Sequence, residues 1–113
     1  MLSWSAEATE TTVDLRAVTD PGVDPLRPGG RELLAYTDAV LAGGGRAAAA
    51  TAVEERLGRN GLVAAAGVIG NFQMMNRIAD GTGMPLGPGS RRRLAGIIET
   101  LGLDRFDHRD EPR

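Results

Sequence analysis

The stretch that most constrains the fold runs from Leu62 to Ala79 and reads LVAAAGVIGNFQMMNRIA. Its first nine residues carry no charge and no large polar group, and polar side chains appear only from Asn71 onward, with apolar ones between them. An apolar run of this kind is typical of a helix that is packed on most of its sides. The stretch therefore predicts the central and most buried helix of a small all-α domain.

Apolar residues at three- and four-residue spacing predict three further helices. Their ranges are Arg31–Ala42, Ala47–Leu57 and Ser90–Leu101. Glycines end the first two helices, at 43–45 and at Gly58, whereas Asn60 and Ser90 are suitable N-caps for the helices that follow them. The length of 113 residues is that of one domain. We expect a single domain over residues 1–113, a bundle of four to five helices around the central one, completed by oligomerisation.

The two ends of the chain are predicted to differ from this core. Residues 1–24 indicate a short helix or an arm, and the turn residues that follow indicate an irregular loop. We expect Trp4 to pack either on its own domain or on a partner subunit. Residues 104–113 form a charged tail that we expect to be frayed.

Composition and charge exclude several classes of function. The chain has no cysteine, so disulfides, thiolate metal sites and dithiol redox chemistry are excluded. The formal net charge of -2 argues against a basic face that binds nucleic acid, and only the run Arg91–Arg93 favours such binding. We therefore expect no nucleic-acid partner. The nine apolar residues are too few to span a bilayer, and Arg77 interrupts any longer span. Because no N-terminal signal pattern and no spanning segment are present, we expect a cytoplasmic protein without a membrane partner. No phosphate-loop, dinucleotide or zinc-hydrolase pattern is present, and we expect no cofactor.

Polar residues gather on the second half of the central helix. Arg77 and Asp80 are three residues apart, and Asn76 and Asp80 are four apart, which are spacings at which helical side chains meet. Such a group could bind the carboxylate of a small ligand, or it could satisfy the polar end of a helix or bridge two subunits. The candidate polar cluster consists of Asn71, Gln73, Asn76, Arg77 and Asp80, and the candidate pocket lining consists of Phe72 and Met75.

The run GLVAAAGVIGNFQMMNRIADGTGMPL resembles the last core helix of the carboxymuconolactone decarboxylase and alkylhydroperoxidase-D-like superfamily. The matching positions are Phe72, Asn76, Arg77, Ala79 and Asp80, followed by residues 83–86. Residues 33–41 resemble the helix before it, so the resemblance covers about residues 20 to 86. Redox members of that family carry a Glu, two cysteines and a His on another helix, an arrangement that this sequence lacks. The resemblance implies an all-α fold and a habit of oligomerising through central helices, without peroxidase or dithiol activity.

Three functions remain open at this point. The leading hypothesis is a non-catalytic helical self-assembly or interaction module, either a homo-oligomer or the complement of a separately encoded partner chain. The second is a cofactor-free enzyme of the lactone-decarboxylase type that acts on a small carboxylated compound at a subunit interface. Arg77 would then bind the carboxylate, and His108 or Asp80 of a neighbouring chain would handle the proton. The third is a small-ligand-binding protein without catalysis. His108 is the only histidine, so no His-based metal site is expected.

Overall fold

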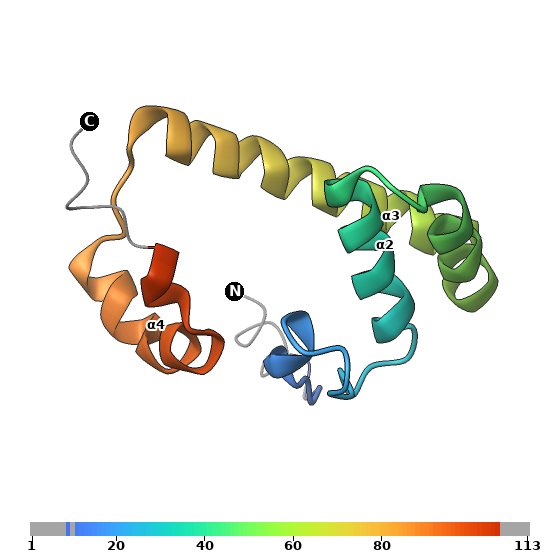
Figure 1. Cartoon of the computed structure of the whole chain (residues 1–113), viewed down its shortest axis with the longest axis horizontal. Helices are drawn as coiled ribbons and strands as arrows, with labels where there is room; N and C mark the ends of the chain where they lie inside the picture. The colour runs from blue at the N-terminus through green and yellow to red at the C-terminus, as the bar shows by residue number, and fades with distance from the viewer. Residues whose placement is uncertain (1–8, 10, 107–113) are drawn as a thin grey trace.

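The computed structural model describes residue 9 and residues 11–106, and all regular structure in this part of the chain is helical. Its elements are the short 3-10 helix η1 (Leu15–Val18), the α-helices α2 (Gly30–Ala42), α3 (Arg46–Thr82) and α4 (Pro88–Leu101), and the 3-10 helix η2 (Leu103–Phe106) (Figure 1). The prediction of an all-α fold is confirmed. The described part contains three α-helices rather than four to five, because two of the predicted helices are joined into α3.

The join lies at Gly58, whose backbone is not helical although the residues on both sides are. Its φ of 75° and ψ of 172° lie in a region that is open essentially to glycine alone. The prediction that Gly58 interrupts the helix is thus correct, but the helix resumes at once, so Asn60 lies inside α3 and is not an N-cap. We call residues 46–57 the proximal arm of α3 and residues 59–82 its distal arm.

The core lies where α2 packs against α3. α2 ends at Ala42, and the N–H of its C-cap, Gly43, donates to the Ala39 carbonyl oxygen at 3.1 Å. The glycine turn that starts there reverses the chain into the proximal arm. Val53 on this arm is fully buried. At the other end of the hairpin, Gly29 has a φ of 72°, which favours glycine, and a Cβ built on it would lie 2.8 Å from the Leu57 Cδ2. Among the described apolar side chains, only Val53, Ala17 of η1 and Pro25 are buried.

The distal arm leads away from this core, and α4 lies at its far end (Figure 1). The main packing partner of α4 is η2, where Arg91 Nη2 lies 2.9 Å from Asp104 Oδ1. The first residues of the predicted charged tail are therefore part of η2 instead of frayed. α4 begins at Pro88 with Gly87 as its N-cap, so Ser90 is not the cap, because proline already has the φ angle of a first helical residue.

The distal arm is exposed in a single copy of the chain. Six of its eight large apolar side chains are between 40% and 62% exposed, whereas Leu62 and Ile69 are half-buried. The six are Val63, Val68, Phe72, Met74, Met75 and Ile78. The sequence predicts the most buried helix here, and the structure of one copy differs because α2 packs near the kink and α4 packs on η2. The apolar surface of the arm is left without cover from the described part of the chain.

The predictions for the chain ends are tested only in part. η1 is the short helix expected within residues 1–24, and it is followed by the expected irregular loop. Trp4 and His108 lie outside the described residues.

Candidate functional site

The predicted polar cluster lies on the distal arm, and its members do not converge on one point. Arg77 and Asp80 are both exposed, and no hydrogen bond or ion pair joins them in the described structure. Asn71 Nδ2 lies 3.6 Å from Met75 Sδ, along the helix surface. Gln73 is half-buried and Asn76 is exposed. The five side chains are therefore distributed along an open helix, and they line none of the cavities described below.

The two predicted pocket residues belong to an apolar stripe instead. Phe72 is 40% exposed and Met75 is 47% exposed. Together with other apolar residues at three- and four-residue spacing they form what we call the first stripe of the distal arm. Its members are Leu62, Ala65, Val68, Ile69, Phe72, Met75 and Ala79.

A second stripe lies on another side of the same helix, and the sequence reasoning missed it. It consists of Val63, Gly67, Gly70, Met74 and Ile78. The same three- and four-residue spacing, counted from Val63 instead of Leu62, identifies it. A Cβ built on Gly67 or Gly70 would meet nothing within 4 Å. Because a helical glycine costs about 1 kcal/mol relative to alanine, these two residues weaken the arm and give no packing within one copy.

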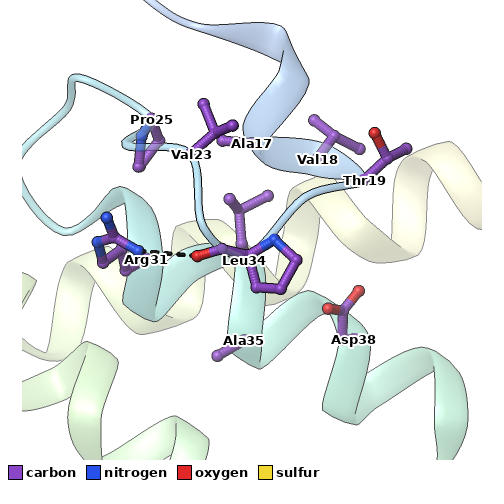
Figure 2. A pocket seen from close by; sticks show the side chains of 10 residues that line it. Ala17, Val18, Thr19, Val23, Pro25, Arg31, Leu34, Ala35 and Asp38 are labelled. Carbon is purple, nitrogen blue, oxygen red and sulfur yellow. Dashed lines mark hydrogen bonds between the residues drawn. The ribbon is translucent and has the colours of Figure 1, made fainter. Parts of the chain in front are cut away.

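A cavity of about 270 Å³ lies between η1, the loop after it and α2 (Figure 2). Its wall is largely apolar and includes the buried residues Ala17 and Pro25. Arg31 lies at the edge and donates from Nη1 to the Pro21 carbonyl oxygen at 3.1 Å, which fastens the loop to α2. The volume is below the usual range for ligand pockets, roughly 300–1,000 Å³. The cavity is therefore the space between α2 and the loop that the Arg31 hydrogen bond joins to it.

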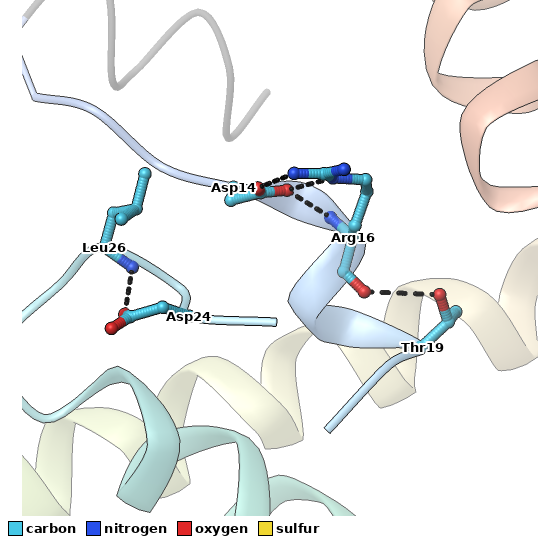
Figure 3. A network of polar contacts seen from close by, with 5 residues as sticks. All are labelled: Asp14, Arg16, Thr19, Asp24 and Leu26. Atoms are coloured by element: carbon cyan, nitrogen blue, oxygen red, sulfur yellow. Dashed lines mark hydrogen bonds and ion pairs between the residues drawn. The ribbon is translucent and has the colours of Figure 1, made fainter. Parts of the chain in front are cut away.

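A polar network fixes the start of η1 (Figure 3). Asp14 is the N-cap, and its Oδ1 accepts from both the backbone N–H and the side-chain Nε of Arg16 at 3.0 Å. The side-chain hydrogen bond from Arg16, followed by the backbone one, holds the pKa of the Asp14 carboxyl below its usual range. In the loop between η1 and α2, the Leu26 N–H donates to Asp24 Oδ1 at 2.8 Å. This network stabilises the segment that covers α2.

α4 has an apolar groove of its own. The groove encloses about 280 Å³ and is bordered by Arg91 and Asp104. Its apolar wall is formed by Leu86, Leu94, Ile97, Ile98 and Leu103. Leu86 before the helix and Leu103 after it are 50% and 38% exposed. The apolar side chains of α4 itself are half-buried, so the groove is open mainly at these two flanking residues.

Two searches of the described residues were negative. They contain no group of three or more metal-ligating side chains that could hold an ion. None of their helices combines the length and the apolar character that crossing a membrane requires.

Comparison with protein-family models, with curated proteins and with solved structures gave no match. The resemblance to the carboxymuconolactone decarboxylase and alkylhydroperoxidase-D-like superfamily therefore stays a prediction. The most prominent feature of the described structure is the exposed apolar surface of the distal arm.

Proposed function

We propose that this chain is a helical self-assembly module whose distal arm pairs with the distal arm of a second copy. The observation that carries the proposal is the exposure of this arm. Six of its large apolar side chains are between 40% and 62% exposed, and they lie on both apolar sides of the arm. Helices that are apolar all round are normally buried. Large exposed apolar surfaces mark interaction sites.

The exposed area is large enough for a stable interface. The whole chain exposes 8667 Å², whereas a folded monomer of 11.9 kDa exposes about 6,000 Å². If all residues outside the described part were counted as fully exposed chain, an excess of about 650 Å² would still remain. A standard interface buries about 800 Å² per partner. Even the smaller excess is therefore close to what each copy contributes to a dimer.

The first stripe is complementary to itself in an antiparallel arrangement. A two-fold axis near residue 70 places Phe72 of one arm opposite Val68 of the other. It also places Ala65 opposite Met75, so a small side chain faces a large one at two equivalent points. Symmetric dimers use the same patch on both subunits in this way. This self-complementarity favours a second copy over an unrelated partner chain.

Charge is compatible with the same arrangement. The distal arm carries both signs, with Arg59 near its start and Asp80 near its end. An antiparallel pair places Arg59 of each copy close to Asp80 of the other. In the single copy Arg59 makes only an exposed contact of 3.5 Å with Glu54, so it is available for this exchange. Exposed pairs contribute orientation more than affinity.

The test is the mass in solution, measured by light scattering on a sizing column over a dilution series. We expect a dimer or a larger closed species for the unchanged chain. Phe72→Glu should give a monomer, because it places a charge at the centre of the first stripe. Leu41→Glu is the matched control, because Leu41 on α2 is 53% exposed but lies outside the arm. The Leu41→Glu variant should keep the mass of the assembly. A well-folded monomer at every concentration of the unchanged chain would overturn the proposal.

A further inference from the structure

We propose that α4 of each copy docks on the distal arm of the other copy, so that the two chains exchange their last helices. The inference rests on the proposed self-assembly and names a second interface within it. It is argued from the linker between α3 and α4, from the lengths of the two apolar surfaces and from the glycines of the second stripe.

The linker keeps α4 away from its own α3. Residues 84–87 have no regular structure, and Met84 and Gly87 each precede a proline. A residue before proline is disfavoured in the helical region and favoured in the extended one. Gly87 has this extended backbone, with φ of −62° and ψ of 151°. Two such steps within five residues oppose the tight reversal that would fold α4 back on its own distal arm.

The turn between α2 and α3 shows what a reversal looks like in this chain. It consists of Gly43, Gly44 and Gly45, and the first and last of these have φ of 78° and 69°. Such left-handed angles are readily available to glycine and allow two helices to pack as a hairpin. The connection between α3 and α4 also begins with a left-handed glycine, Gly83 with φ of 64°, but it continues through two residues that precede proline instead of two further glycines.

The second stripe of the distal arm fits α4 in length. α4 has 14 residues and is about 21 Å long. The second stripe runs from Val63 to Ile78, which spans about 22 Å along the helix. The groove of α4, with Leu94, Ile97 and Ile98 in its wall, is apolar like the stripe. Each surface can thus cover the other along its whole length.

The glycines of the second stripe are explained by this docking. Gly67 and Gly70 have open space around them in one copy. Small residues allow two helix backbones to approach closely, and that approach requires a partner helix. When the first stripe is covered by the other arm and the second stripe by the exchanged α4, both apolar sides of the distal arm are buried. A reciprocal exchange closes on itself, so the assembly ends at two copies.

The absence of cysteine from the chain gives a direct test by cross-linking. Met74→Cys in the second stripe is mixed with one of three α4 variants, Leu94→Cys, Ile97→Cys or Leu101→Cys. Each mixture is refolded together, oxidised, and analysed by mass after denaturation without reductant. Ile97→Cys mixed with Leu41→Cys on α2 is the matched control. Met74→Cys is also combined with each of the three α4 substitutions in a single chain.

We expect a covalent heterodimer from the Met74→Cys mixture at one or more of the α4 positions and none from the control mixture. A disulfide that forms only within the doubly substituted chain would overturn the exchange, because α4 would then lie on its own arm. The absence of any link at all three positions would overturn it as well. If light scattering still finds the assembly in either case, the exchange fails and the proposed self-assembly stands. A monomer in solution contradicts both.

Discussion

At the scale of single residues, the link between Asp14 and Arg16 makes a prediction about pH. Because the hydrogen bonds from Arg16 lower the pKa of Asp14, the ionised carboxyl stabilises the start of η1. This stabilisation is fully present above the ordinary pKa of aspartate, about 4, and is lost as the pH falls through the lowered value. Arg16→Gln should raise the midpoint of the Asp14 titration toward the ordinary value. The measurement is the carboxyl carbon shift of Asp14 by NMR, and equal midpoints in both proteins would contradict the prediction.

Other residues show why local sequence does not determine burial. The sequence analysis predicts Phe72 and Met75 as the lining of a pocket beside the polar cluster. In the structure they belong to the first stripe, and both are exposed in one copy of the chain. The residue types and their spacing define the stripe, but what covers it depends on distant parts of the chain or on another copy.

At the scale of elements, the kink at Gly58 is expected to require glycine. Gly58→Ala should lower the free energy of unfolding by about 1–3 kcal/mol, because its φ and ψ are strained for any other residue. The cost comes from the backbone alone, since a Cβ there would meet nothing within 4 Å. Gly81→Ala is the control: its site is also open, but it lies in regular helix, so alanine should stabilise by about 0.5–1 kcal/mol. Urea unfolding measures both, and a gain in stability for Gly58→Ala would show that α3 straightens without cost.

The linker between α3 and α4 gives the second prediction at this scale. Pro85→Gly should raise the dissociation constant of the assembly by about tenfold, because a freer linker lets α4 fold back on its own arm. Pro28→Gly, in the exposed turn before α2, makes the same change away from the linker and should leave the constant unchanged. Dilution series by light scattering compare the two. An equal effect of both substitutions would mean that the linker does not control where α4 docks.

The helices themselves could largely be predicted from the sequence, because apolar spacing and glycine turns are local features. α2 and α4 lie close to their predicted ranges, and the glycine turn after α2 lies where it was expected. The join across Gly58 could not be predicted, since a glycine after a helix usually marks its end. The placement of α4 away from α3 could not be predicted either, because it depends on the backbone angles of the linker before Pro88.

At the scale of the whole molecule, the stability of the fold is expected to depend on assembly. The described part buries few apolar side chains in one copy, so in the proposed assembly most of the apolar burial would come from the interface. The midpoint of thermal unfolding should therefore rise with protein concentration, by about 3–4 °C for each tenfold increase, as mass action requires for a dimer of this size. Phe72→Glu should unfold at a lower temperature that does not depend on concentration, whereas Leu41→Glu should keep the dependence. Circular dichroism over a hundredfold range of concentration measures all three. A midpoint of the unchanged chain that stays constant over this range would show that one copy is stable alone, and it would contradict the role given to the distal arm.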